Sequence, residues 1–144
     1  MALFVAAVIY ILDRLTKSII IAGLSQSQSV MVIPNIFHIT LILNKGTAFG
    51  LFKNQSIFFV LLSLLVISVI ILYICKNKLR NIILSIALGL ILGGAVGNLV
   101  DRIRFGYVVD FLDFRIWPVF NIADSAITIG LALLAWNILC IPSS

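Results

Sequence analysis

The sequence predicts an all-α membrane protein with four transmembrane helices, and three observations carry this prediction. Hydrophobic residues make up 62% of the 144 residues. Charged residues make up only 10%, whereas soluble domains contain about 25%. The apolar residues also gather in four segments of about 20 residues, the length of helix that crosses a bilayer core about 30 Å thick. We therefore expect a single integral membrane domain over residues 1–144.

The four apolar segments are expected to span the membrane at about residues 2–22, 56–75, 82–101 and 123–141. The first span is interrupted by Asp13, Arg14 and Lys17. Because Asp13 and Lys17 are four residues apart, their side chains can pair on one helix face and neutralise each other. The segment is not expected to be a cleavable signal peptide, since no basic region precedes it and no small-residue cleavage site follows it.

The densest basic cluster lies in the short connection between the second and third spans, at Lys76, Lys78 and Arg80. Cytoplasmic connections are enriched in Lys and Arg, so this connection is expected to face the cytoplasm. Both termini then face the cytoplasm as well, and the segments 23–55 and 102–122 lie on the outer side.

The first outer segment contains two runs with the composition of β-strands, at residues 30–33 and 36–43. The second run is rich in β-branched and aromatic residues and ends at Asn44-Lys45-Gly46, which is typical of a turn. A small sheet on the outer membrane surface is therefore expected.

All five acidic residues of the chain are aspartates, and four of them gather where the third and fourth spans meet. These four are Asp101, Asp110, Asp113 and Asp124. An ionisable side chain near a bilayer is costly and is by default a candidate functional residue. Asp110 has apolar neighbours, which would raise the pKa of its carboxyl group through desolvation. A turn residue facing water is the alternative, and composition alone does not choose between Asp110 and Asp113.

Asn121 and Asp124 have the spacing of a capping box at the start of the fourth span, in which each side chain binds a backbone N–H group of the other. An acid in the first turn also complements the helix dipole. The functional alternative is that Asp124 projects into the bundle, on a face shared with Asn121, Ser125 and Thr128.

The third span contains three glycines at a spacing of four residues, Gly89, Gly93 and Gly97. This spacing predicts close packing against another helix. Asn98, Asp101 and Arg102 follow on one helix face. Asp101 and Arg102 either anchor the helix end at the membrane interface or belong to a site.

Two carboxylates held close together share one proton, because both cannot ionise easily. The ionised one can activate a water molecule as a general base, while the protonated one polarises a scissile carbonyl group. Such a pair needs no metal ion and no cofactor, and we expect neither. His38 stands alone, and Cys75 and Cys140 are expected to be small packing residues at span ends.

Other functions could use the same residues. The carboxylates could bind a cation or relay protons in a small transporter, or the helices could form a purely structural bundle. A transporter is expected to hold a carboxylate near the middle of the membrane, whereas Asp110 and Asp124 lie near one surface and only Asp13 approaches the middle. This depth favours a hydrolase at the outer interface. A nucleic-acid partner is not expected, because the basic residues behind the net charge of +5 are scattered.

Five motifs follow one another along the chain. They are Asp13-Arg14-Leu15-Thr16-Lys17, Asn44-Lys45-Gly46-Thr47-Ala48-Phe49-Gly50, Gly97-Asn98-Leu99-Val100-Asp101-Arg102, Val108-Val109-Asp110-Phe111 and Phe120-Asn121-Ile122-Ala123-Asp124-Ser125. In these motifs, and over nearly its whole length, the chain resembles the lipoprotein signal peptidase (signal peptidase II) family.

The resemblance implies that Asp110 and Asp124 are the catalytic pair and that Asp113 is not catalytic. It implies a substrate cleft lined by Asn44, Asn98, Arg102 and Asn121. It also implies supporting roles for Asp13, Lys17 and Asp101, with Asp101 supporting Arg102 at a helix end.

The fold implied by the resemblance adds a small extracytoplasmic β cradle and a loop over the site to the four helices. The implied activity is that of an aspartic endopeptidase in the bacterial cytoplasmic (inner) membrane, with its site near the outer face. Its implied partners are membrane lipid and a prolipoprotein whose cysteine carries diacylglycerol. The enzyme would cleave the signal peptide on the N-terminal side of that cysteine. No obligate protein partner is implied.

Overall fold

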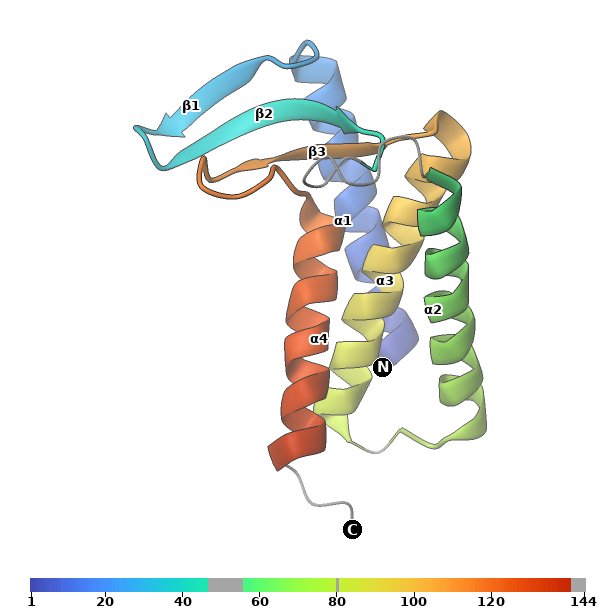
Figure 1. Ribbon diagram of the computed structural model, residues 1–144. Coiled ribbons are helices and arrows are strands. Elements are labelled where there is room, and N and C mark those ends of the chain that lie inside the picture. The colour runs from blue at the N-terminus through green and yellow to red at the C-terminus, as the bar shows by residue number, and fades with distance from the viewer. Residues whose placement is uncertain (47–55, 80, 141–144) are drawn as a thin grey trace.

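The computed structural model describes residues 1–46, 56–79 and 81–140, and it shows a bundle of four helices with a small sheet across one end (Figure 1). The elements are α1 (Ala2–Gly23), β1 (Ser29–Ile33), β2 (Phe37–Asn44), α2 (Ser56–Lys76), α3 (Ile82–Phe105), β3 (Val108–Asp113) and α4 (Ile122–Cys140). The fold is therefore mostly helical, as expected. Residues 47–55, 80 and 141–144 lie outside the described residues, and the loop over the site stays a prediction.

Helix α3 lies at the centre of the bundle and contacts the other three helices. Its glycines set how closely two of these helices approach. A Cβ atom built on Gly93 would lie 2.6 Å from the carbonyl oxygen of Ala6 in α1. A Cβ atom built on the next residue, Gly94, would likewise clash with the carbonyl oxygen of Ala123 in α4. The predicted close packing of the glycine stripe is confirmed, and its partner is α1.

Three helices, α2, α3 and α4, are long and apolar enough to cross a membrane by length and composition. Helix α1 is not one of these three, because its 22 residues include Asp13, Arg14 and Lys17. Helix α2 shows most of its apolar side chains on the outside, and only Ile70 is fully buried. That distribution suits a helix whose surroundings are hydrocarbon and not water.

The ends of the helices agree with the predicted spans to within a few residues, with one exception. Helix α3 continues to Phe105, so Arg102 and Arg104 lie in its last turn and not in an irregular outer segment. Gly106 then ends the helix in the left-handed conformation (φ 76°), and its N–H group donates to the carbonyl oxygen of Arg102. A residue without a Cβ atom adopts this conformation at no steric cost. The longer helix carries Arg102 to the edge of the sheet.

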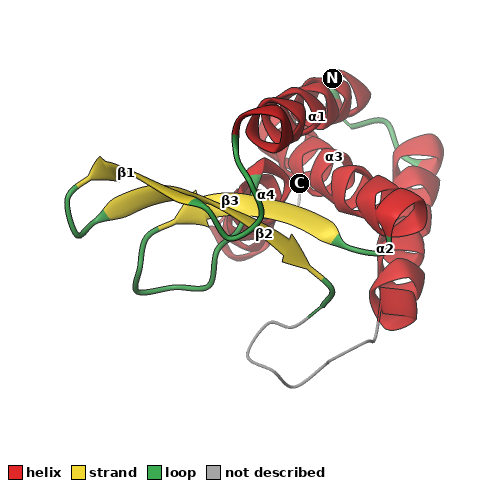
Figure 2. Cartoon of the chain, turned by 90° about the horizontal axis from the view of Figure 1, so that it is seen from above, coloured by secondary structure: helices red, strands yellow, loops and turns green. Residues whose placement is uncertain are grey.

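The sheet has three antiparallel strands in the order β1-β2-β3. Strands β1 and β2 coincide with the two predicted runs, whereas β3 was not predicted. Four consecutive residues of β3, 108–111, are buried, so the strand lacks the alternation of buried and exposed residues that identifies most strands. Strand β3 contacts helices α1 and α3, and β1 extends beyond the bundle in the view along the helices (Figure 2).

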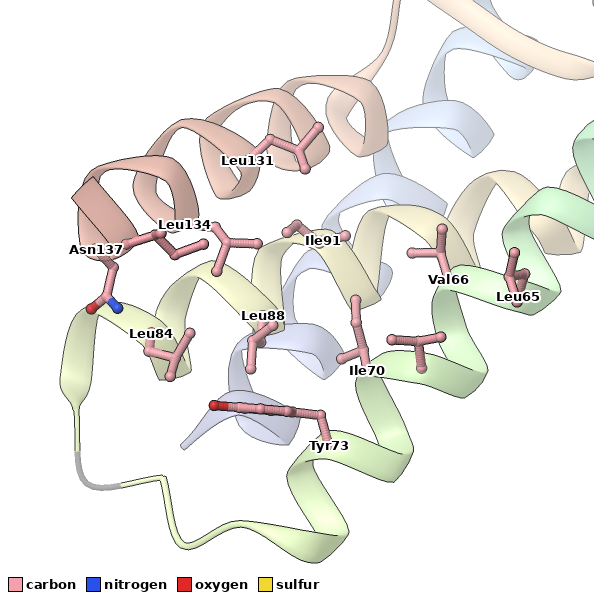
Figure 3. A pocket seen from close by; sticks show the side chains of 12 residues that line it. Leu65, Val66, Ile70, Tyr73, Leu84, Leu88, Ile91, Leu131, Leu134 and Asn137 are labelled. Carbon is pink, nitrogen blue, oxygen red and sulfur yellow. The ribbon is translucent and has the colours of Figure 1, made fainter. Parts of the chain in front are cut away.

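A groove of about 540 Å³ separates α2 from α4 on the side of the bundle away from the sheet. Its floor is formed by Leu84, Leu88 and Ile91 of α3. Tyr73 and Asn137 lie near the end of the groove that is farthest from the sheet (Figure 3). Among the described residues that line it, none is acidic or basic. The aspartates that the sequence singles out do not line this groove, so the candidate site is sought elsewhere.

Candidate functional site

A second pocket, of about 530 Å³, lies where the sheet meets the neighbouring ends of the helices. Asp110 of β3 and Asp124 of α4 both line it, together with Arg102 of α3 and Asn44 of β2. The rest of its described lining is mainly apolar: Ile42, Gly46, Phe59, Trp117, Pro118, Val119 and Phe120. Two carboxylates and one guanidinium group thus share a largely apolar pocket. We refer to Asp110 and Asp124 as the aspartate pair and to this cavity as the site pocket.

Asp110 is held by two asparagine side chains. It is 1% exposed. Its Oδ2 accepts a hydrogen bond from Nδ2 of Asn44 (2.8 Å), and its Oδ1 accepts one from Nδ2 of Asn121 (2.7 Å). Asn44 reaches it because Ile42 of β2 pairs with Asp110, which places Asn44 diagonally across the two strands. The sheet register therefore positions one partner of the carboxylate, and the start of α4 positions the other.

Asp124 lies in the first turn of α4, and it combines the two roles that the sequence suggested. It caps the helix, and it also faces the site. Its Oδ2 accepts the backbone N–H of Asn121 (3.3 Å), and its own N–H donates to Oδ1 of Asn121 (2.9 Å), which is a capping box. Its Oδ1 accepts a hydrogen bond from Nδ2 of Asn98 (2.7 Å) while the residue lines the site pocket. The cap fixes the carboxylate in place and leaves it facing the cavity.

The orientation of each asparagine amide in the site follows from its neighbours. Oδ1 of Asn44 accepts the N–H of Gly46 (2.9 Å), and Oδ1 of Asn121 accepts the N–H of Asp124. Oδ1 of Asn98 accepts from the ammonium group of Lys17 (3.1 Å). Because a donor faces each carbonyl oxygen, each NH₂ group faces an aspartate. All three amides therefore present hydrogen-bond donors to the aspartate pair.

Burial raises the pKa of Asp110 to about 7, and the nearby charge of Asp124 adds to this increase. The hydrogen bonds from Asn44 and Asn121 act in the opposite direction but do not cancel it. A carboxyl group with this pKa holds its proton at slightly acidic pH, where an ordinary aspartate is ionised. At slightly acidic pH Asp110 can therefore supply a proton close to the carboxyl group of Asp124.

Behind the aspartate pair, four side chains form ion pairs with one another. They are Asp13, Arg14, Lys17 and Asp101, which we call the buried ion cluster. Nζ of Lys17 lies 2.9 Å from Asp13 and 2.8 Å from Asp101, and the guanidinium group of Arg14 lies 2.8 Å and 2.6 Å from the same two residues. The cluster also binds backbone groups of the neighbouring elements. Oδ2 of Asp101 accepts the N–H of Val109 in β3, and Oδ1 of Asp13 accepts the N–H of Ala123 in α4, both at 3.3 Å.

This cluster corrects one prediction and extends another. Asp101 was expected to support Arg102, but its ion pairs are with Arg14 and Lys17. Asp13 does pair with Lys17, as its spacing suggested. Arg14 received no role from the sequence, although a third charged residue inside an apolar span indicated that it needed a partner. Arg102 instead lies over the ring of Phe59, 5.1 Å from its centroid, at the wall of the site pocket.

The four residues expected to line a substrate cleft fall into two groups. Asn44 and Arg102 line the site pocket. Asn98 and Asn121 are 3% and 0% exposed and are not among the described residues lining it. They donate hydrogen bonds to the aspartate pair from behind it, and their place in a substrate cleft stays a prediction. The sequence indicated which residues belong to the site but not the direction in which their side chains point.

Asp113 lies outside the site pocket, at the other end of β3. Its Oδ2 accepts a hydrogen bond from Thr40 (2.8 Å) and forms an ion pair with Arg115 (3.1 Å). Both partners belong to the sheet and the turn after it. Within the parts of the chain that the structure describes, no three His, Cys, Asp or Glu side chains lie close enough together to hold a metal ion.

The family model of signal peptidase (SPase) II matches residues 5–140. The lipoprotein signal peptidase of Halothermothrix orenii is 44% identical over 134 residues, which cover 93% of this chain and 92% of the relative. That of Pelotomaculum thermopropionicum is 46% identical over 135 residues, which cover 94% and 89%.

Two solved structures described as a bacterial membrane enzyme have the same fold. One superposes with a TM-score of 0.86 at 32% identity, covering 99% of this chain and 92% of the other. The second has a TM-score of 0.88 at 33% identity, covering 98% and 94%. The arrangement of helices and sheet is therefore shared with membrane enzymes over almost the entire chain.

Proposed function

The chain belongs to the signal peptidase II family, which cleaves the signal peptides of lipoproteins, and we propose that Asp110 and Asp124 are its catalytic pair. One observation carries this proposal. The two carboxylates line the same pocket, and one residue, Asn121, donates a hydrogen bond to each of them. Such a shared partner holds two carboxylates in a fixed relation, which acid–base catalysis on one substrate bond requires.

The pair works with one shared proton. Asp124 accepts a proton from a water molecule, whose oxygen attacks the carbonyl carbon of the scissile peptide bond. Asp110 donates its proton to the carbonyl oxygen, which its raised pKa allows near neutral pH. As the tetrahedral intermediate collapses, the proton held by Asp124 passes to the leaving nitrogen and Asp110 recovers its own. The products are a free carboxyl group on the signal peptide and a free amine on the lipoprotein.

The walls of the pocket suit a substrate that is partly lipid. The substrate is a prolipoprotein whose cysteine carries diacylglycerol, and the bond that is cut lies just before that cysteine. Apolar side chains such as Trp117 and Phe120 face the space beside the aspartate pair. Arg102 and Asn44 supply hydrogen-bond donors at the same wall. A guanidinium group there can bind a carbonyl or lipid headgroup oxygen through charge-assisted hydrogen bonds.

We propose that α1 is a fourth membrane span of the single domain. Its charged residues do not prevent this, because Asp13 is 0% exposed and Lys17 is 2% exposed, and both lie in the buried ion cluster. Ion pairs inside a bundle are how charged residues are tolerated at membrane depth. The basic residues Lys76 and Lys78 then lie in the cytoplasm with both termini, and the sheet and the aspartate pair lie at the outer face of the bacterial inner membrane.

Single substitutions test the catalytic pair. Asp110→Asn and Asp124→Asn should each abolish cleavage of a diacylglyceryl-modified prolipoprotein in detergent or lipid, followed by mass spectrometry of the products, while the protein still inserts in the membrane. Asp113→Asn is the matched control and should retain most of the activity, because the partners of Asp113 among the described residues belong to the sheet and the following turn. Near wild-type cleavage by either variant of the pair would refute the assignment.

A further inference from the structure

We infer that Lys17 is a positioning residue for the aspartate pair and acts through the side-chain amide of Asn98. The inference rests on the proposed catalytic pair and adds to it a group that does not touch the substrate. Lys17 is 2% exposed and lies in α1, whereas the pair lies in β3 and α4. Among the described residues that line the site pocket, neither Lys17 nor Asn98 is present.

The contacts of Lys17 account for all three of its N–H groups. Its ammonium group lies 2.9 Å from Asp13, 2.8 Å from Asp101 and 3.1 Å from Oδ1 of Asn98. An ammonium group only donates hydrogen bonds, so the atom of Asn98 that faces it is the carbonyl oxygen. The NH₂ group of Asn98 is thereby directed to Oδ1 of Asp124, at 2.7 Å.

Asn98 differs in this respect from the other two asparagines of the site. Backbone N–H groups orient Asn44 and Asn121. Asn98 depends on side chains, which are Lys17 and Nδ2 of Asn121 at 3.1 Å. That Nδ2 has two hydrogens but lies near three acceptors, which are Asp110, Asn98 and the carbonyl oxygen of Val109. Lys17 is therefore the firmer anchor of the Asn98 amide.

Without Lys17 the carbonyl oxygen of Asn98 keeps only Nδ2 of Asn121 as a donor, and that Nδ2 is shared among three acceptors. The amide of Asn98 is then free to rotate, and its hydrogen bond to Oδ1 of Asp124 no longer fixes that carboxylate in the site pocket. A displacement of about 1 Å in a catalytic group can lower a rate about 10²-fold. The effect should appear in kcat and not in KM, because Lys17 does not reach the site pocket.

Lys17 also contributes charge. The charged groups around Asp110 are Asp124 from α4, Arg102 from α3 and the buried ion cluster from α1 and α3. The cluster contains two positive and two negative groups, so removing Lys17 leaves a net negative charge beside the pair. Since a nearby positive charge favours the ionised carboxylate, its loss raises the pKa of Asp110. The descending limb of the pH–activity profile then moves to higher pH.

Two substitutions separate orientation from charge. Lys17→Met and Lys17→Gln both remove the positive charge, but only glutamine retains an NH₂ group that can donate to Oδ1 of Asn98. We expect kcat to fall about 10²-fold in Lys17→Met and only about tenfold in Lys17→Gln, with KM within about twofold of wild type in both. Both variants should show the same shift of the descending limb to higher pH.

Equal kcat values for the two variants at matched folded fractions, or an unchanged pH profile, would overturn the inference. If Lys17→Met fails to accumulate, the double variant Lys17→Met/Asp101→Asn restores charge balance in the cluster. It should still show the loss in kcat, and wild-type kcat there would also refute the role of Lys17.

Asp110→Asn, assayed in parallel, separates the two proposals. If that variant keeps its activity, the catalytic pair itself is wrong. If it is inactive while both Lys17 variants behave as wild type, only the positioning role fails.

Discussion

Asn121 and Asp124 cap helix α4 reciprocally: the backbone N–H of Asn121 donates to Oδ2 of Asp124 at 3.3 Å, and the N–H of Asp124 donates to Oδ1 of Asn121 at 2.9 Å. The same Asn121 side chain donates to Oδ1 of Asp110 at 2.7 Å. A motif that commonly only begins a helix therefore also joins the two carboxylates of the site. The capping box and the proposed catalytic pair therefore share the same residues.

Asn121→Ala should therefore lose both stability and activity. Loss of a side-chain cap costs about 1 kcal/mol, and loss of the donor to Asp110 should lower kcat about 10²-fold. Asn81→Ala is the control, because Oδ1 of Asn81 caps α3 by accepting the N–H of Leu84 at the opposite end of the bundle. Thermal unfolding in detergent should show similar losses for the two variants, with activity retained only in Asn81→Ala. Equal kcat values would show that Asn121 acts through stability alone.

The activity of the wild-type protein should fall as the pH rises through about 7. Burial and the charge of Asp124 raise the pKa of Asp110 to about 7, so the shared proton is present below that pH and lost above it. The measurement is kcat for a lipid-modified substrate between pH 5 and 9 at constant ionic strength. A rate that stays constant up to pH 9 would contradict Asp110 as the acid.

The stability of Asp110→Asn relative to wild type should increase with pH. Because the pKa of Asp110 is raised in the folded state, the wild-type protein loses stability as the pH rises from about 4 through about 7. The asparagine variant has no such titration, so the difference in melting temperature between variant and wild type should become more positive from pH 5 to pH 8.

Asp113→Asn should not show this gain. Burial pushes the pKa of Asp113 up, but hydrogen bonds from Thr40 and Arg115 outweigh burial and hold the pKa below its usual value. Ionisation of Asp113 therefore stabilises the fold above its ordinary pKa, and that stability is lost as the pH falls through the lowered value. If the difference in melting temperature between variant and wild type changes equally with pH for Asp110→Asn and Asp113→Asn, the assignment of the raised pKa to Asp110 is contradicted.

The orientation in the membrane can be tested with the two free cysteines. Cys75 and Cys140 are exposed at the ends of α2 and α4 that lie away from the sheet. A thiol reagent that does not cross membranes should leave both unlabelled in intact spheroplasts and label them after permeabilisation. Ser25→Cys, in the exposed turn after α1, is the control and should be labelled without permeabilisation. Labelling of Cys75 in intact spheroplasts would reverse the proposed orientation.

The helices could be predicted from the sequence because the length of an apolar segment is a local property. Strand β3 could not, since helix ends and the neighbouring strand bury most of its residues and remove the alternation on which strand prediction depends. Without the resemblance to a family, Asp110 and Asp113 were equivalent. They differ in surroundings that only the fold supplies, namely asparagine donors and the site pocket for one, and Thr40 and Arg115 for the other.

Only the contacts within one helix of the buried ion cluster could be predicted from the sequence. Asp13 and Lys17 are four residues apart on one helix, so their contact follows from helical geometry. The contacts of Asp101 with Arg14 and Lys17 cross from α3 to α1, and no spacing along the chain encodes them. Gly97 is the residue that allows this approach, since a Cβ atom there would lie 2.7 Å from Oδ2 of Asp13.

The position of Asp124 in the last helix has a consequence for the biogenesis of the protein. Asp110 lies in β3, which is synthesised before α4, so a chain that has not yet inserted α4 carries one carboxylate without its partner. The cap that orients Asp124 forms only when the first turn of that helix is folded. The proposed catalytic pair is therefore complete only once the first turn of α4 has folded, and a chain that lacks α4 should not cleave peptides.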